Sequence, residues 1–99
     1  MELYQAEWCP HSHKVRQRLT ELGLDFWARQ VRADPDERGA MKQHVGTEEI
    51  PVLVSDDGEH IRGEDDILDY LSRFVPGRDE GAHRDKAREE VPTFAEVGG

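Results

Sequence analysis

The chain has 99 residues, of which 35% are hydrophobic and 35% are charged, and its formal net charge at pH 7 is −9. This length suits one small domain with a single core, and the acidic balance argues against a nucleic-acid partner, because phosphate binding needs basic clusters. No apolar run is long enough to cross a bilayer, and Met1 leads into Glu2 without the basic start and apolar stretch of a signal peptide. We therefore expect a cytoplasmic protein with no membrane partner.

The first third of the chain predicts a strand–helix–strand unit. Residues 2–5 alternate between polar and apolar side chains, as in a strand. Residues 10–22 have apolar side chains at helical spacing and are followed by a glycine that suits a helix end. These residues are Val15, Leu19, Leu22 and Gly23. Residues 25–31 alternate and carry two aromatic side chains, which is typical of a second strand.

The middle of the chain predicts a helix, a hairpin and another helix. Residues 34–45 begin with an Asp-Pro pair and an acidic first turn, which favours a helix of low apolar content. Residues 50–54 read as a buried strand, and residues 59–62 as its return strand after an Asp-Asp-Gly turn. Residues 64–74 form an amphipathic helix pattern whose first turn is acidic, where the helix dipole favours negative charge.

The element order β-α-β-α-β-β-α over residues 1–75 predicts an α/β domain with a four-stranded mixed sheet flanked by helices. Residues 76–99 are rich in charged side chains and poor in large apolar ones. We expect a flexible C-terminal tail there, with a short helix around Ala82 to Glu90 as the alternative.

The single cysteine, Cys9, has no partner for an intramolecular disulfide. Pro10 suits the first helical position, which places Cys9 at the helix N-cap. Free backbone N–H groups and the helix dipole stabilise a thiolate there, and the thiolate is the nucleophilic form. The hydroxyl or amide of Ser12 is placed to point at the sulfur. The alternative is that Cys9 is a small buried apolar residue, and its polar neighbours, such as Glu7 and His11, argue against it.

Two histidines follow the cysteine, and they raise the question of a metal site. His11 and His13 occupy alternate positions at a helix start, so they do not converge with Cys9 on one ion. No further acid or thiol nearby completes a tetrahedral set. We therefore expect no metal at this position, although His11 is close enough to Cys9 to influence its charge.

Pro51 opens a strand that reads as central, although a proline there removes a ladder donor. A cis peptide bond between Ile50 and Pro51 would account for this placement, because cis prolines mark sharp bends. The same bond would leave the backbone of Ile50 free to pair with an extended ligand.

Three segments, WCPHS (8–12), EEIPVLV (48–54) and GEDDILDYL (63–71), occur in this order with these gaps. Together they resemble the glutaredoxins and the N-terminal domains of glutathione transferases, over residues 1–75. The resemblance implies a thioredoxin-like fold. It also implies that Cys9 is the catalytic cysteine and that Ser12 replaces the second cysteine, as in monothiol variants.

The resemblance further implies a binding site for a small thiol. Ile50 and a cis Pro51 would hold the cysteinyl part of glutathione, and Glu64 and Asp65 would bind its γ-glutamyl end. The residues that flank the cysteine are expected to line the same site, namely Trp8, Pro10 and His11. Many glutaredoxins have a lysine just before the cysteine, whereas Glu7 and Trp8 occupy that loop here. A small thiol other than glutathione is therefore an alternative ligand.

The activity implied is that of a monothiol glutaredoxin-like thiol–disulfide oxidoreductase. Its co-substrate is glutathione or another low-molecular-weight thiol, its partners are disulfide-containing or thiolated proteins, and no cofactor is bound permanently. We expect a monomer or weak dimer. One alternative is a transferase-like or non-catalytic thiol-binding module. A carrier of an iron–sulfur cluster is less favoured, because Pro10 stands where such relatives usually have glycine.

Overall fold

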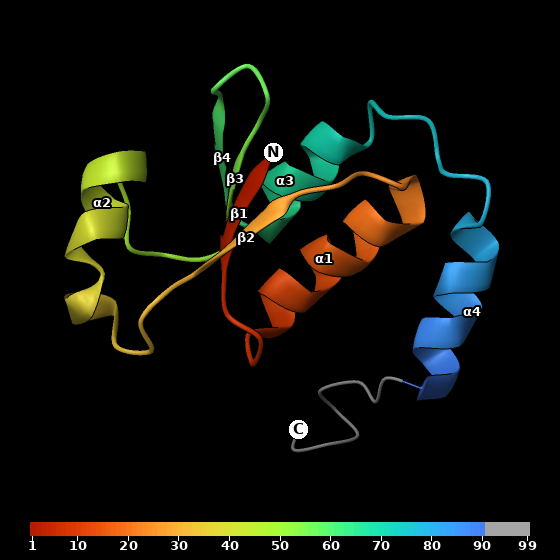
Figure 1. Ribbon diagram of the computed structural model, residues 1–99, viewed down its shortest axis with the longest axis horizontal. Helices are drawn as coiled ribbons and strands as arrows, with labels where there is room; N and C mark the ends of the chain where they lie inside the picture. Colours follow the sequence, from red (N-terminus) through yellow and green to blue (C-terminus); the bar gives the residue numbers. More distant parts are fainter. Residues whose placement is uncertain (91–99) are drawn as a thin grey trace.

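The computed structural model describes residues 1–90, and these residues form a four-stranded mixed sheet (Figure 1). The strand order is β2-β1-β3-β4, with β1 parallel to β2 and antiparallel to β3, and β3 antiparallel to β4. The strands are β1 (Glu2–Gln5), β2 (Trp27–Gln30), β3 (Val52–Val54) and β4 (His60–Arg62). The predicted α/β architecture is confirmed, with shorter strands at positions 27–30 and 52–54 than the sequence pattern indicated.

Helices α1 (Pro10–Leu22) and α3 (Glu64–Leu71) pack together on one face of the sheet. Pro10 begins α1, and Gly23 ends it in the left-handed conformation (φ 70°), which glycine adopts without strain. The two helices and the sheet enclose the main apolar cluster. Its buried members are Leu3, Val15, Leu19, Leu22, Leu53, Ile67 and Leu71.

The opposite face of the sheet carries α2 (Gly39–Val45) and a smaller cluster of Met41, Val45 and Val52 (Figure 1). The single helix predicted over residues 34–45 is divided into a 3₁₀ turn, Pro35–Glu37, and α2. The chain leaves helical geometry at Arg38, where φ is −95° and ψ is 36°.

The division at Arg38 has a physical reason in its side chain, which is buried. The guanidinium group donates hydrogen bonds to the backbone carbonyls of Arg32 (2.7 Å), Ala33 (3.1 Å) and Glu48 (2.7 Å). Five donors in a rigid fork allow one arginine to satisfy several carbonyls at once. Arg38 therefore ties the segment before α2 to the segment after it.

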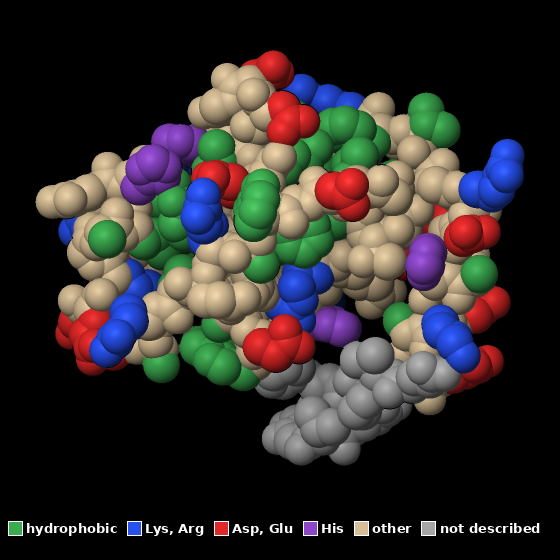
Figure 2. All heavy atoms as spheres, in the orientation of Figure 1, with side chains coloured by type: hydrophobic (Ala, Val, Ile, Leu, Met, Phe, Trp, Pro, Cys, Tyr) green, Lys and Arg blue, Asp and Glu red, His purple; other side chains and the backbone are tan. Residues whose placement is uncertain are grey.

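Strand β2 is an edge strand, and all four of its residues are exposed. The predicted alternation of Trp27 with its neighbours therefore does not correspond to a buried face, since the Trp27 side chain is 74% exposed. Charged side chains of both signs are interspersed over the face of the molecule that Figure 2 shows.

The last described element is α4 (Glu80–Glu90), which lies beside α1 (Figure 1). The sequence favoured a flexible segment here and a short helix as the alternative, and the structure has the helix. The part of that prediction on positions 91–99 lies outside the described residues. The chain reaches α4 through Gly77, whose amide donates to the carbonyl of Glu21 at 3.0 Å. A Cβ atom on Gly77 would lie 2.7 Å from that oxygen, so the close approach requires glycine.

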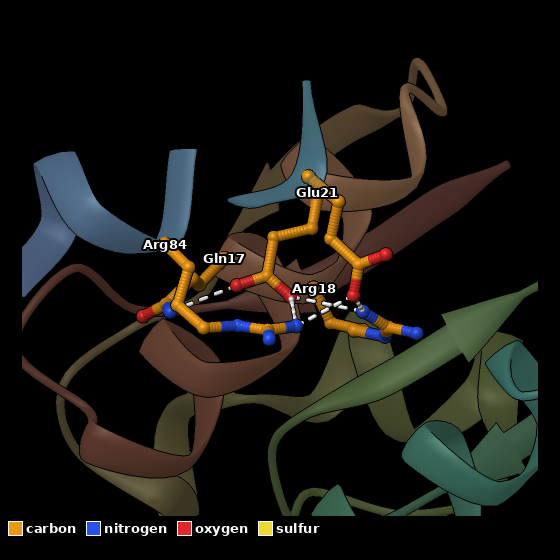
Figure 3. Close-up of polar contacts among 5 residues, drawn as sticks. Gln17, Arg18, Glu21 and Arg84 are labelled. Carbon is orange, nitrogen blue, oxygen red and sulfur yellow. Dashed lines mark hydrogen bonds and ion pairs between the residues drawn. The ribbon is translucent and has the colours of Figure 1, made fainter. Parts of the chain in front are cut away.

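Four charged side chains join α4 to α1 (Figure 3). Arg18 donates to Glu21 at 2.9 Å and to Glu80 at 2.8 Å. Arg84 donates to Glu80 at 2.5 Å and to Glu21 at 3.4 Å. Each carboxylate therefore contacts one arginine from each helix, which holds α4 against α1 without a large apolar face.

Glu21 is the buried member of this network, with its side chain only 5% exposed. Burial by itself would raise the pKa of its carboxyl group. The hydrogen bonds from Gln17, Arg18 and Arg84 outweigh that effect and hold the pKa below its usual range. The pKa of Glu80 is also lowered, first by its hydrogen bond from Arg18.

Candidate functional site

Cys9 lies at the N-cap of α1 with extended backbone (φ −80°, ψ 121°), and Pro10 is the first helical residue. The predicted placement of the cysteine is confirmed. Its amide donates to the carbonyl of Ala6 at 3.1 Å, and its carbonyl accepts from the amide of His13 at 3.0 Å. The residue thus joins the loop after β1 to the first turn of the helix.

The side chain of Cys9 is only 6% exposed. Its polar neighbours Glu7 and His11 do face solvent, as does Trp8, but they do not keep Cys9 itself at the surface. Cys9 is instead buried together with Ala6. Most of Cys9 is therefore withdrawn from solvent, and no cap hydrogen bond from a backbone N–H to its side chain is formed within the described residues.

Ser12 follows one turn later in α1 and is fully buried. Its hydroxyl has no hydrogen-bond partner among residues 1–90, so it is not bonded to the Cys9 sulfur. A buried hydroxyl without a partner is costly, at about 1–3 kcal/mol. An unused donor therefore lies in the interior, in the first turn of the helix that begins at Cys9.

The peptide bond between Ile50 and Pro51 is cis, as predicted. Pro51 is buried, and its carbonyl accepts a hydrogen bond from the amide of Gly63 at 2.9 Å. Within the described part of the chain, no hydrogen bond uses the backbone N–H or C=O of Ile50. The predicted free backbone at Ile50 is therefore present.

The sheet topology gathers the predicted site residues at one end of the sheet. Strand β1 runs toward the Cys9 loop, and β3 starts at the same end because Tyr4 pairs with Val52 in antiparallel register. Arg62, the last residue of β4, also pairs with Val52, so α3 begins at this end as well. The Cys9 loop, Ile50–Pro51 and the first turn of α3 are neighbours for this reason.

Glu64 at the start of α3 contacts two side chains of α1. The His11 imidazole Nδ1 lies 2.6 Å from Glu64 Oε1, and the Lys14 ammonium lies 3.6 Å from Glu64 Oε2. Both carboxylate oxygens are thus in use, and the Glu64 side chain is 14% exposed. The neighbouring Asp65 is exposed and has no hydrogen bond or ion pair with any described residue.

A hollow of about 360 Å³ opens at this point of the surface. The residues that line it come from the start of α1 and from the junction of β4 with α3, and they are His11, Arg62, Gly63, Glu64, Asp65 and Asp66. Three predicted site residues therefore share one hollow. The contact between His11 and Glu64 was not predicted, because the two residues are 53 positions apart and meet only through the packing of α1 against α3.

Arg16 is a residue of this region that the sequence did not single out. Its guanidinium group lies 3.5 Å from the Glu7 carboxylate, donates to the carbonyl of Ala6 at 3.3 Å and also donates to the side chain of Gln5. The negative charge of Glu7 next to the cysteine therefore has a partner. Its position two turns into α1 gave no signal in the sequence, because only the folded loop brings these groups together.

Residues 1–90 contain no group of three or more His, Cys, Asp or Glu side chains that could hold a metal ion. None of the helices in the same range is long and apolar enough to cross a membrane.

The family assignment follows from a comparison of the sequence with protein-family models, in which the Glutaredoxin model matches residues 1–61. The chain belongs to the glutaredoxin family. It is 28% identical over 67 residues to Glutaredoxin 3 of Escherichia coli (strain K12), an alignment that covers 68% of this chain and 80% of that protein.

Solved structures extend the likeness of this glutaredoxin-family chain to glutathione transferases. A glutathione S-transferase from Rhodospirillum rubrum F11 is 32% identical, with a TM-score of 0.63. The match covers 73% of this chain and 32% of the transferase chain. A glutathione S-transferase from Methylobacillus flagellatus KT, with GSH bound, is 28% identical with a TM-score of 0.63, covering 88% and 45%. The chain spans less than half the length of either structure. The thioredoxin-like fold is confirmed.

Proposed function

We propose that this glutaredoxin-family chain is a monothiol thiol–disulfide oxidoreductase that acts on mixed disulfides of glutathione or a similar small thiol. The observation that carries the proposal is the placement of Cys9 at the N-cap of α1, at the same end of the sheet as the unpaired backbone of Ile50. A thiolate at a helix N-terminus is stabilised by the helix dipole.

The reaction has two exchange steps. In the first, the Cys9 thiolate attacks the small-thiol sulfur of a protein mixed disulfide. A disulfide forms between Cys9 and the small thiol, the original disulfide breaks, and the protein sulfur leaves as a thiolate that takes up a proton. In the second, the thiolate of another small-thiol molecule attacks the same sulfur, releases Cys9 and leaves as a symmetric disulfide.

An external thiol is needed for the second step, because Ser12 cannot attack a disulfide as a second cysteine would. We place the reaction in the cytoplasm, where small thiols are kept reduced. Its substrates are disulfide-containing or thiolated proteins, and the chain works as a monomer or weak dimer.

The small thiol occupies the end of the sheet described above. The free backbone of Ile50, before cis Pro51, pairs with the cysteinyl part of the thiol, and the side chains next to Cys9 line the site, namely Trp8, Pro10 and His11. The first turn of α3, with Glu64 and Asp65, receives the γ-glutamyl end. This placement is supported by the N-cap residue of α3, Gly63, which has no side chain to cap the helix. The backbone N–H groups of the first turn are therefore left for a carboxylate. The relative from Methylobacillus flagellatus with GSH bound favours glutathione as this thiol.

One observation favours a second candidate, a transferase-like or non-catalytic thiol-binding module. Cys9 is 6% exposed, whereas reactive cysteines are usually more accessible. Under this alternative the chain binds the small thiol at the same place without exchanging it.

The test is the reduction of a glutathione mixed disulfide of a short peptide, with glutathione as the second substrate. We expect turnover by the native chain and a loss of at least ~100-fold in Cys9→Ser and Cys9→Ala, since both remove the nucleophile. Without free glutathione, the native chain should carry one glutathione on Cys9 by intact mass. Binding of glutathione without turnover or adduct would exclude the oxidoreductase and leave the thiol-binding module.

A further inference from the structure

We propose that two copies of this chain associate through strand β2. The two β2 strands pair antiparallel about a two-fold axis at Ala28, and the exposed Trp27 of each copy enters a hollow of the other. The interface goes beyond the proposed function and does not depend on it.

The outer edge of β2 offers free backbone groups for this pairing. Strand β2 is the first in the order β2-β1-β3-β4, so it has a strand partner on one side only within residues 1–90. The amides of Trp27 and Val31 donate to backbone carbonyls in or directly before β1. Because successive residues of a strand direct their N–H and C=O groups to opposite sides, those of Ala28 and Gln30 point away from the sheet.

Two-fold symmetry restricts how a strand can pair with a second copy of itself. Residues directly opposite each other in an antiparallel pair lie on the same face of the sheet, so the axis passes through one residue position. An axis at Ala28 makes this residue a hydrogen-bonded pair with its own copy and places Trp27 opposite Arg29 of the second copy. An axis at Gln30 would place Trp27 opposite Ala33, beyond the end of the strand.

Trp27 and a hollow beside β2 indicate that the occupant of this edge is a second copy. The Trp27 side chain is 74% exposed. It lies on the α2 side of the sheet together with Arg29, because Arg29 is in register with Tyr4, which packs against the small cluster under α2. On the same side, a hollow of about 430 Å³ lies between β2 and α2, and its lining includes Tyr4, Arg29, Val31 and Met41.

The register at Ala28 brings the tryptophan and the hollow together. Trp27 of one copy lies opposite Arg29 and diagonal to Val31 of the other, and a large aromatic side chain can contact both. By symmetry the second tryptophan does the same. One strand therefore supplies both the protruding side chain and the hollow that receives it, as a self-complementary interface requires.

The charges at the interface favour a weak dimer. The Arg29 guanidinium lies 2.6 Å from the Glu2 carboxylate, so the approach of an indole covers no unpaired charge and adds a cation–π contact. The net charge of −9 on each copy opposes association. Salt screens this repulsion, so the dimer should become stronger as the ionic strength rises.

The pairing leaves both candidate sites uncovered. Strands β1 and β2 run parallel toward the Cys9 loop. Antiparallel association through β2 therefore places the two Cys9 loops at opposite ends of the joined sheet.

The first experiment is sedimentation equilibrium of the full chain at low and high NaCl. We expect a reversible monomer–dimer equilibrium whose dissociation constant falls by about 3–10-fold at high salt. Trp27→Ala removes the protruding side chain, and Ala28→Pro removes an outward N–H that an edge strand can lose without harm to its own sheet. Each should weaken association by about 10-fold or more. Val75→Ala is the control, because it shortens a side chain that is 86% exposed and lies outside β2, and it should change nothing.

The second experiment tests the register by disulfide cross-linking in a Cys9→Ser background. Ala28→Cys places two thiols on the axis, where the Cα atoms of a hydrogen-bonded pair are about 5.5 Å apart, within the range of a disulfide. Gln30→Cys is the matched control, because its two copies are displaced by four residues along the strands, about 14 Å. Mild oxidation should cross-link Ala28→Cys at least ~10-fold faster than Gln30→Cys.

Three outcomes would each overturn the proposal. The native chain could stay monomeric at both salt concentrations, or its dimer could persist unchanged in either Trp27→Ala or Ala28→Pro. Equal rates of cross-linking in the two cysteine variants would show that the strands do not pair about Ala28.

Discussion

Glu21 near the end of α1 accepts a hydrogen bond at 3.4 Å from Arg84 of α4, 63 residues further along the chain. Glu21 is buried, and it also accepts from Arg18 at 2.9 Å. The attachment of α4 to the rest of the protein therefore depends on a carboxylate that is largely withdrawn from water. Loss of its charge would remove one of the two carboxylates that Arg18 and Arg84 contact and leave Glu80 as the other.

The first prediction concerns this carboxylate. Glu21→Gln keeps the size of the side chain and removes the charge, so we expect the free energy of unfolding to fall by about 1–3 kcal/mol. Urea denaturation measures the change. Glu37→Gln is the control, because Glu37 makes an exposed ion pair with Arg32 and should cost about 0.5 kcal/mol or less. Equal effects of the two substitutions would contradict the role of Glu21.

The second prediction is a loss of stability in acid. Hydrogen bonds hold the pKa of Glu21 below its value in the unfolded chain, and the pKa of Glu80 is lowered in the same direction. The stability that they contribute is fully present above the unfolded-state pKa of about 4.3 and is lost as pH falls through the lower folded-state pKa. Urea denaturation from about pH 5 to about pH 3 should show this loss. The decrease of unfolding free energy with falling pH should be less steep in Glu21→Gln. An unchanged steepness would show that Glu21 does not contribute to the acid sensitivity.

The third prediction concerns Arg38, whose guanidinium group donates to three backbone carbonyls. Arg38→Met keeps most of the apolar stem and leaves these carbonyls without their donor, so we expect a loss of about 2–4 kcal/mol in unfolding free energy. Arg38→Lys should recover part of it, because an ammonium group reaches fewer of the three. The exposed Arg78, replaced by Met, should change stability by less than about 0.5 kcal/mol.

The fourth prediction compares two glycines. Gly77→Ala would place a Cβ 2.7 Å from the carbonyl oxygen of Glu21, so backbone must move, and we expect a loss of about 1–3 kcal/mol. Gly81→Ala lies in α4 with no atom within 4 Å of the new Cβ, and it should stabilise the protein by about 0.5–1 kcal/mol. Limited proteolysis between α3 and α4 gives a second measurement. A stabilising Gly77→Ala would show that the close approach is absent.

The fifth prediction separates stability from activity at Ser12. Because its buried hydroxyl has no partner in the described chain, Ser12→Ala should leave unfolding free energy unchanged or raise it by up to about 1 kcal/mol. The sequence predicts that the hydroxyl or amide of Ser12 points toward the Cys9 sulfur. If the hydroxyl donates to that sulfur during exchange, the rate of mixed-disulfide reduction should fall in Ser12→Ala. Thermal unfolding and the peptide assay together check this. Lower stability with unchanged rate would contradict both parts.

The sequence predicted most of the fold because its signals were local. Apolar spacing indicated α1 and α3, and Pro10 with Gly23 marked both ends of α1. The division of the helix over 34–45 could not be predicted, since it follows from the bonds of Arg38 to carbonyls on both sides of α2. Helix α4 was not favoured because few of its residues are apolar, and the side chains that hold it to α1 are charged.

The candidate site shows the same limit. The N-cap position of Cys9 and the cis bond before Pro51 followed from neighbouring residues and are present. The burial of Cys9 did not follow, because polar neighbours indicate the environment of a segment and not the direction of one side chain. The contact of His11 with Glu64 depends on the docking of two helices, so only the folded structure reveals it.

The position of α3 has a consequence for how small this protein can be made. The matching family segment ends at residue 61, yet Ile67 and Leu71 are fully buried in one cluster with Leu3 and Leu53. A fragment that ends at residue 61 would leave the apolar face of its sheet exposed to water. We expect such a fragment to aggregate and not to fold. The shortest piece that can stand alone therefore has to reach Leu71.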